Sequence, residues 1–208
     1  MKNIFKIAAL GAVLVMGTTS CEKDSNNVID QVFDGVTSGA VLRTINIVSN
    51  ELPLGDESAS FQVEIEEQDA QDGDLLESVD VYLTFADGSA DEGDSSGGTT
   101  DEVFIRNIPA SEFSPGPFGL PRTTYTITLS EMLSAVGLTG DQIFGGDTFT
   151  TRMSLNLTDG RVFSVDNAGG IITGGFFASP FQYTTPVVCP VGEEEFLGAY
   201  QITNGVPG

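Results

Sequence analysis

The stretch FTTRMSLNLTDGRVFSV, Phe149–Val165, decides the fold class expected for this chain. Apolar and polar residues alternate along its first half, and this two-residue period predicts a β-strand with one buried face. The side expected to be buried carries Phe149, Thr151, Met153, Leu155 and Leu157. Asp159-Gly160 then predicts a type I′ turn with both residues at positive φ, and Arg161–Val165 returns as the second strand of a β-hairpin.

Alternation of the same kind recurs on both sides of this hairpin and predicts further strands. They are expected over residues 40–48, 61–66, 79–85, 103–108, 123–129 and 181–188. Short strands separated by turn signals, with almost no helix, favour an all-β fold. We expect an antiparallel, immunoglobulin-like β-sandwich, with a closed barrel as the alternative. The chain has no Trp and no Cys pair that could cross the sheets, which excludes an antibody-type core.

One helical signal lies between the expected strands. Ser130 is expected to cap a short helix over Glu131–Val136, which Gly137 ends, and this helix would plug one end of the β-domain. A Pro-rich crossing covers residues 109–121, and a Gly-rich loop covers residues 169–175.

The N-terminus has the features of an export signal. Lys2 and Lys6 give the chain a positive start, and a ten-residue apolar run follows, Ile7–Met16, which is too short to span a bilayer as a helix. Small residues then lead into Cys21, the arrangement that lipoprotein processing requires: a diacylglyceryl group alkylates the cysteine sulfur, and the chain is cut before it. We therefore expect residues 1–20 to be a lipoprotein signal peptide and Cys21 to carry the membrane anchor.

This processing sets the expected domain organisation. A lipidated flexible tether covers residues 21–38, a β-sandwich domain covers residues 39–189, and residues 190–208 hold a linker and the start of a second, truncated module. The alternative for the last segment is a short strand added to the first sheet. Because Cys21 is alkylated, Cys189 has no internal partner, and we expect it to be a small, half-buried hydrophobe outside any disulfide.

The strongly negative charge excludes several classes of partner. The chain has 30 acidic and 8 basic residues, and two of the basic ones lie in the signal peptide. Without a basic patch the domain cannot displace counterions, so nucleic-acid binding is excluded. Docking on an anionic lipid surface is unfavourable for the same reason, and we expect the domain to stand off the membrane on its tether.

The residue types that most catalytic sites need are missing. The chain has no His, which removes Ser/His/Asp and Cys/His nucleophiles and most zinc and copper sites. Its acidic residues cluster in Gly/Ser-rich loops, and we expect none of them in the apolar surroundings that raise a carboxyl pKa. We therefore expect a protein that is not an enzyme and has no cofactor, with a hydrolase built on two carboxylates as the alternative.

The acidic loop after residue 86 offers candidate metal ligands. Hard cations such as Ca²⁺ prefer closely spaced oxygens in a flexible loop. The candidate ligands are Asp87, Ser89, Asp91 and Asp94. A second set of closely spaced acids is formed by Asp69, Asp72 and Asp74. The alternative to a calcium site is a solvated acidic surface.

Tyr82 is the candidate platform for a ligand. It lies on the polar side of the strand expected over residues 79–85, where an exposed ring could stack against a sugar. The alternative role is packing against a neighbouring strand.

Several segments resemble a known group of proteins. These segments are VDVYLTF (79–85), GDTFTTR (146–152), LTDGRVFS (157–164) and SPFQY (179–183) followed by Val188-Cys189. They resemble uncharacterised surface lipoproteins found beside the TonB-dependent porin and lipoprotein lid of starch-utilisation-type nutrient-uptake systems. The resemblance covers most of residues 40–189.

The resemblance implies an accessory lipoprotein of the outer membrane, exposed at the cell surface and built of immunoglobulin-like modules. It implies that Glu22, Lys23 and Asp24 act as the signal for display on the outer face. Its partners would be the porin, the lid and a polysaccharide. The leading expectation is therefore a non-catalytic protein that serves glycan uptake by binding ligand or organising partners. The alternative is a structural or adhesive surface module stiffened by calcium.

Overall fold

The computed structural model describes residues 38–88 and 98–190. Several predictions fall outside these ranges. They concern Cys21, the display signal Glu22–Asp24, the candidate calcium ligands Ser89, Asp91 and Asp94, and residues 191–208. The fold belongs to the compact unit that begins at Gly39. Within the described ranges, no helix is long and apolar enough to cross a membrane.

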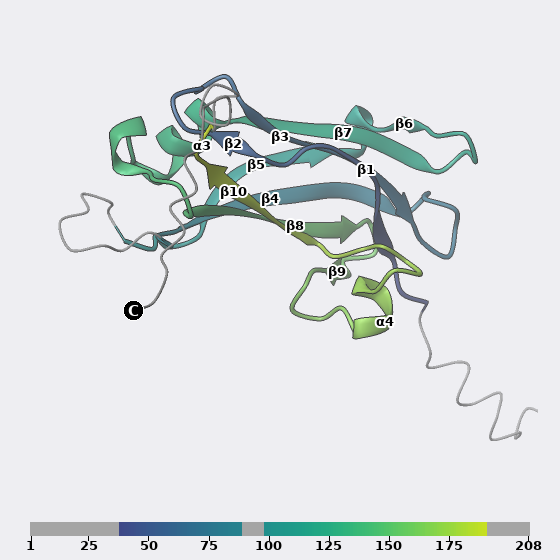
Figure 1. Ribbon diagram of the computed structural model, residues 1–208. Coiled ribbons are helices and arrows are strands. Elements are labelled where there is room, and N and C mark those ends of the chain that lie inside the picture. The colour runs from purple at the N-terminus through teal and green to yellow at the C-terminus, as the bar shows by residue number, and fades with distance from the viewer. Residues whose placement is uncertain (1–37, 89–97, 191–208) are drawn as a thin grey trace, which may run out of the picture. The chain divides into compact units, whose positions relative to one another are not determined.

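Two sheets pack face to face, which confirms the predicted all-β sandwich (Figure 1). One sheet has the order β1 (Val41–Ser49), β3 (Ser60–Gln68), β7 (Pro121–Thr128) and β6 (Ser114–Pro115). The other has the order β2 (Leu52–Pro53), β10 (Gln182–Val188), β8 (Thr148–Leu157), β4 (Leu76–Ala86) and β5 (Val103–Pro109). In addition, β9 (Val162–Phe163) pairs with β8. Neighbouring strands are antiparallel except for β2 and β10, which are parallel.

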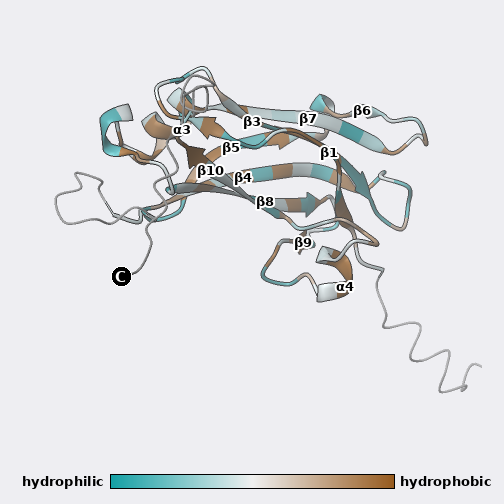
Figure 2. Ribbon diagram, viewed as in Figure 1, coloured by the Kyte–Doolittle hydropathy of each residue, from teal (hydrophilic) through white to brown (hydrophobic). Residues whose placement is uncertain are grey.

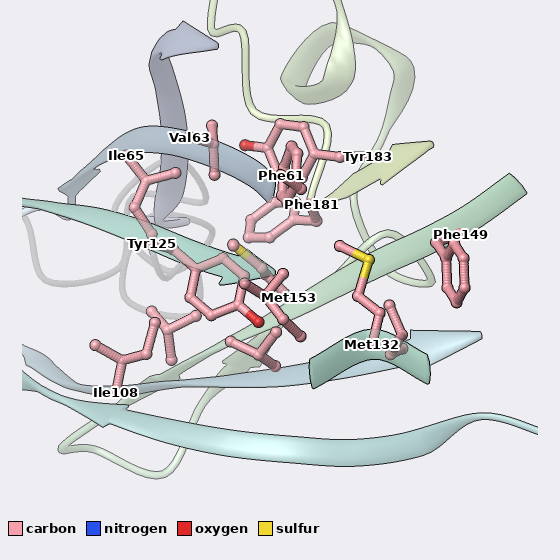
Figure 3. Close-up of a cluster of buried hydrophobic side chains, with 14 of the residues drawn as sticks. Phe61, Val63, Ile65, Ile108, Tyr125, Met132, Phe149, Met153, Phe181 and Tyr183 are labelled. Atoms are coloured by element: carbon pink, nitrogen blue, oxygen red, sulfur yellow. The ribbon is translucent and has the colours of Figure 1, made fainter. Parts of the chain in front are cut away.

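The core lies between the two sheets and follows the alternation seen in the sequence (Figure 2). From the first sheet, β3 contributes Phe61, Val63 and Ile65, all fully buried. From the second, β4 and β8 contribute Val79, Val81, Leu83, Phe85, Phe149, Met153 and Leu155, also fully buried. Aromatic rings meet within this cluster, with the centroids of Phe61 and Tyr183 5.3 Å apart (Figure 3). Burial of large side chains at about 25 cal/mol per Å² of apolar surface stabilises the sandwich without a disulfide.

The hairpin over residues 149–165 is present, but its turn differs from the predicted type I′. Gly160 has a positive φ of 84°, whereas Asp159 does not. The Gly160 N–H donates to the Leu157 carbonyl at 2.9 Å, and the Leu157 N–H donates to the Arg161 carbonyl at 3.0 Å. Three residues therefore form the loop and only its last is left-handed, which is the three-residue alternative to a type I′ turn. The returning strand β9 is also shorter than predicted.

Helix α3 (Leu129–Val136) begins two residues earlier than predicted, and Ser130 is not its cap. Thr128 is the N-cap: its side chain accepts from the Glu131 N–H, and the Glu131 carboxylate accepts from the Thr128 N–H at 2.8 Å. This reciprocal capping box satisfies two backbone donors that a helix start otherwise leaves open. Gly137 ends the helix in the left-handed conformation, as predicted.

The position of the cap can be tested by mutation. Thr128→Ala is expected to lower the free energy of unfolding by about 1 kcal/mol, because it removes the capping oxygen. Ser130→Ala is the matched control, since Ser130 is exposed and makes no capping bond, and it should change stability by less than about 0.5 kcal/mol. Urea unfolding of both variants measures the difference. Equal losses would place the cap elsewhere.

The segments predicted as loops contain short elements. The Pro-rich crossing holds η1 (Ala110–Glu112) and β6, a second 3-10 turn η2 (Gly140–Gln142) follows α3, and the Gly-rich loop holds α4 (Gly170–Thr173). Cys189 is a free cysteine and is exposed, so the expectation that it is half-buried was wrong. It follows the last residue of β10 and therefore lies beyond the edge of the core.

Candidate ligand-binding cleft

A cleft of about 590 Å³ opens along one edge of the sandwich. It forms there because β5 is the last strand of its sheet, and β6 borders β7 only through the pairs Ser114–Arg122 and Pro115–Pro121. The rest of β7 therefore borders the open space between β7 and β5, and helix α3 closes this space at one end. The lining residues come from these three elements: Phe104, Ile105 and Arg106 of β5, Tyr125, Thr126 and Ile127 of β7, and Ser130, Glu131, Ser134 and Ala135 of α3.

The cleft combines an exposed ring with hydroxyl groups. Phe104 is 57% exposed, although it is a large apolar side chain. Hydroxyls come from Thr126, Ser130 and Ser134. A volume of a few hundred Å³ with mixed apolar and hydrogen-bonding lining suits a small organic ligand.

The charged groups of the cleft are already engaged by neighbours. Arg106 forms a two-pronged ion pair with Glu112, with its Nη2 at 2.5 and 2.6 Å from the two carboxylate oxygens. Glu131 accepts the capping bonds from Thr128, and the backbone bond is the main reason that the Glu131 pKa lies below its ordinary value. The Arg106 charge is thus compensated by Glu112, and the Glu131 carboxylate is held by the helix start, so neither charged group is free of a partner in the protein.

Tyr125 contributes a buried polar group. Its side chain is 3% exposed, and among the described residues its hydroxyl has no hydrogen-bond partner. Burial raises the pKa of the phenol. A buried hydroxyl without a partner costs about 1–3 kcal/mol, so the wall of the cleft retains an unfavourable feature.

Tyr82 lies on the outer face of β4, as the alternation predicted, and packs against its neighbours there. The Arg152 guanidinium carbon lies 4.3 Å from the centre of its ring, and the Phe104 ring meets it edge-on at 5.6 Å. Glu102 holds Arg152 through bonds of 2.6 and 2.5 Å. The packing considered as the alternative role is therefore present.

Phe104 is an exposed ring that was not among the site residues predicted from the sequence. It pairs with Tyr82 across β4 and β5 and connects the outer face with the cleft. The alternation in the sequence indicates that this ring is exposed. Phe104 lies between Val103 and Ile105 and shares the two-residue phase of the charged Arg106. That phase places the ring on the polar side of the predicted strand.

Of the first set of candidate calcium ligands, the structure describes only Asp87, which is partly buried. In the second set, Asp69 accepts three backbone N–H groups, from Gln71, Gly73 and Leu75, at 2.6, 3.1 and 2.9 Å. Asp72 and Asp74 are exposed. Within residues 38–88 and 98–190, no group of three or more acids, cysteines or histidines is arranged to hold a metal ion.

Glu67 overturns the expectation that no acid sits in apolar surroundings. It is fully buried, and neither of its carboxylate oxygens has a hydrogen-bond partner in the described part of the chain. Burial, together with the nearby Asp69 charge, raises its pKa to about 8. Glu67 was not predicted to be buried, because it belongs to a run of acids, EIEE, that is typical of a solvent-facing segment.

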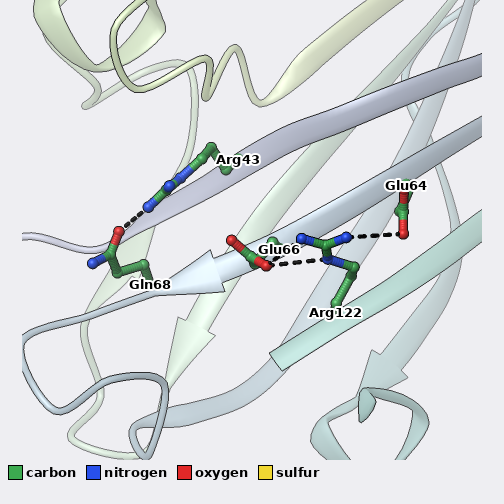
Figure 4. Close-up of polar contacts among 5 residues, drawn as sticks. All are labelled: Arg43, Glu64, Glu66, Gln68 and Arg122. Carbon is green, nitrogen blue, oxygen red and sulfur yellow. Dashed lines mark hydrogen bonds and ion pairs between the residues drawn. The ribbon is translucent and has the colours of Figure 1, made fainter. Parts of the chain in front are cut away.

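The neighbouring acids are paired, which makes Glu67 distinct. Glu66 accepts bonds from Arg122 at 2.7 and 3.1 Å, and Glu64 pairs with the same guanidinium at 3.4 Å (Figure 4). Gly73 packs on the Glu67 carboxyl: a Cβ at Gly73 would lie 3.2 Å from Oε2. Glu67 is therefore sealed under the turn between β3 and β4 and does not line the cleft.

Comparisons of the chain with models of protein families and with curated proteins found no match. The function is therefore inferred from the residues and their geometry.

Proposed function

We propose that this chain is a non-catalytic lipoprotein of the outer-membrane surface, anchored through Cys21, that serves nutrient uptake by binding a glycan. The observation that carries the proposal is the cleft beside β5, where the exposed ring of Phe104 stands next to hydroxyl groups from β7 and α3. The porin and the lipoprotein lid of the same uptake system are its proposed partners.

The chemistry of the cleft fits an uncharged sugar. A pyranose ring has apolar C–H faces that stack on aromatic rings and hydroxyl edges that exchange hydrogen bonds. Phe104 offers the first contact, and Thr126, Ser130 and Ser134 offer the second. Because Arg106 and Glu131 are already bonded within the protein, the cleft does not require a charged substituent on the ligand.

We propose further that the sandwich is immunoglobulin-like. The order β1-β3-β7-β6 matches the strand order A-B-E-D of that fold in both chain sequence and pairing. The order β5-β4-β8-β10 matches C′-C-F-G in the same way. The cleft then lies between the C′ and E strands, where the short β6 leaves the edge open.

The binding role is tested with Phe104→Ala. In affinity electrophoresis against a panel of soluble α- and β-glucans, the parent protein should be retarded by at least one polysaccharide. The variant should bind that polysaccharide roughly tenfold more weakly, because it loses the stacking contact. Its unfolding midpoint should change little, since the ring is more than half exposed.

Phe118→Ala is the matched control for this test. Phe118 is 87% exposed and lies in the turn between β6 and β7, outside the lining of the cleft. The control should bind as the parent does. If no polysaccharide retards the parent, or if both variants lose binding equally, the cleft is not a glycan site and the structural surface module becomes the better proposal.

A further inference from the structure

The loop that contains α4 is unlike the rest of this acidic chain. From Asn167 to Pro190 there is no charged side chain, and no other part of the chain has a charge-free run of this length. Elsewhere acids are dense: seventeen Asp and Glu lie between Arg43 and Arg106. From Asn167 onward the loop therefore adds no charge to a protein that is otherwise strongly negative.

The loop also exposes large apolar side chains. Ile171 is 77% exposed and Phe176 is 87% exposed. The rings of Phe176 and Phe177 meet edge-on with centroids 4.9 Å apart. We call Ile171, Phe176 and Phe177 the apolar tip. A cluster of exposed apolar side chains marks an interaction surface, because contact with water is unfavourable for them and nothing within the fold covers them.

The apolar tip lies beside the point where the chain enters the fold. The backbone N–H of Thr44 donates to the Ala178 carbonyl at 2.7 Å, and the N–H of Leu42 donates to the Ser179 hydroxyl at 2.8 Å. Gly39 lies close to Phe163, since a Cβ there would be 4.0 Å from its ring. Figure 1 shows α4 next to β9 and near the start of β1. The first residues of the β-domain, which the expected tether joins, thus contact the chain immediately after the tip.

We propose that the apolar tip inserts into the bilayer interface next to the Cys21 anchor. The inference rests on the proposed lipidation of Cys21. Sixteen residues separate Cys21 from Ser38, and even fully extended they reach roughly 55 Å, so the tip is held at high effective concentration above the membrane. Phenylalanine and isoleucine side chains partition into the interface, and the charge-free stretch from Asn167 to Pro190 carries none of the acids that would be repelled by an anionic surface.

Insertion of the apolar tip departs from the expectation that the net charge keeps the whole domain off the membrane. Net charge acts on the whole domain over about one Debye length, roughly 8 Å at physiological salt. The apolar tip is the place where the acid-rich surface is interrupted. The domain then rests on the bilayer through this tip and leaves the cleft, on the opposite edge formed by β5 and β7, open to the outside.

The test uses the absence of Trp from the chain. Phe176→Trp in the full-length lipoprotein, reconstituted into phosphatidylcholine vesicles with brominated acyl chains, places a single fluorophore on the tip. We expect its emission to shift to shorter wavelength and to be quenched at least about twofold more than that of Phe118→Trp. Both positions are 87% exposed, and Phe118 lies on the β6–β7 turn, at the opposite edge of its sheet from β1.

The outcomes separate this inference from the anchor on which it rests. Mass spectrometry of the same sample reports acylation of Cys21. Acylated Cys21 with unquenched emission from Phe176→Trp would overturn the inference and leave the anchor intact, whereas an unmodified Cys21 would overturn the anchor. Equal quenching of the two variants would also overturn the inference. So would a spectral shift of Phe176→Trp that appears in detergent as protein concentration rises, because it would reveal contact between copies of the chain.

Discussion

Glu67→Gln is expected to stabilise the fold at pH 7, by about 3 kcal/mol in the free energy of unfolding. The Glu67 carboxyl is buried without a partner among the described residues, and its pKa in the fold is about 8. At pH 7 the unfolded chain ionises this group, whereas the folded chain keeps it protonated. Folding at pH 7 therefore requires the Glu67 carboxylate to bind a proton, which costs free energy. Glutamine is neutral in both states and has nearly the same side-chain shape, so the variant avoids this cost.

The pH dependence of this gain follows from the direction of the shift. Below the ordinary value of 4.5 both states of the parent are protonated, and the two proteins should have similar stability. Between 4.5 and about 8 the parent loses stability relative to the variant as pH rises, because only its unfolded state releases the proton. Above about pH 8 the difference should become constant. Urea unfolding from about pH 4 to about pH 9 measures the curve.

Glu66→Gln is the control for this prediction, because it makes the same change at the neighbouring position. Glu66 is equally buried but accepts two bonds from Arg122. Neutralising it weakens an ion pair and should destabilise the fold by about 1–2 kcal/mol. Opposite signs at adjacent positions are the expected result. A destabilising Glu67→Gln at pH 7 would show that the Glu67 carboxylate has a partner in solution.

Asp69→Ala should be the more damaging change in the same region, with a loss of about 3 kcal/mol in the free energy of unfolding. The Asp69 carboxylate accepts the backbone N–H groups of Gln71, Gly73 and Leu75, so it organises the whole turn between β3 and β4. Hydrogen bonds to a charged acceptor contribute more than neutral ones, and removing the acceptor leaves donors unsatisfied at a partly buried site.

Asp74→Ala is the matched control, since it removes the same charge from the same turn. Asp74 is exposed, and its loss should change the free energy of unfolding by less than about 0.5 kcal/mol. Hydrogen exchange of the amides of Gly73 and Leu75 gives a second measurement. Both should exchange faster in Asp69→Ala and at the parent rate in Asp74→Ala. Equal effects of the two substitutions would mean that charge, rather than the three hydrogen bonds, sets the stability of the turn.

Much of the fold could be predicted from the sequence, because each main strand buries one face and therefore alternates visibly. Phe149, Met153 and Leu155 mark β8 in this way, and all are buried. The errors occur where local signals compete. Ser130 and Thr128 are both good capping residues, and the Glu three residues after Thr128 decides between them. The dipeptide Asp159-Gly160 is compatible with both a type I′ turn and a three-residue loop. The register between β8 and β9 selects the three-residue loop, in which only Gly160 is left-handed.

The candidate site was less predictable, because it depends on contacts between distant segments. The cleft exists only because β6 pairs so briefly with β7, and no local pattern sets the length of that pairing. Tyr82 was placed on the correct face, but the ring that reaches the cleft is Phe104 from the neighbouring strand. Glu67 shares the two-residue phase of the buried Val63 and Ile65, so the alternation did place it inward, but its charge and its place in a run of acids favoured a solvent-facing position.

The pairing of β2 with β10 has a consequence for how the protein is made. Leu52 aligns with Val187, so residues near the two ends of the domain must meet before the second sheet is complete. Closing so long a loop carries an entropic cost and slows folding, which leaves the nascent polypeptide open until its last strand has been synthesised. Under the proposed export across a membrane, such a delay keeps the chain extended for translocation and lets it collapse only after the whole domain has emerged on the far side.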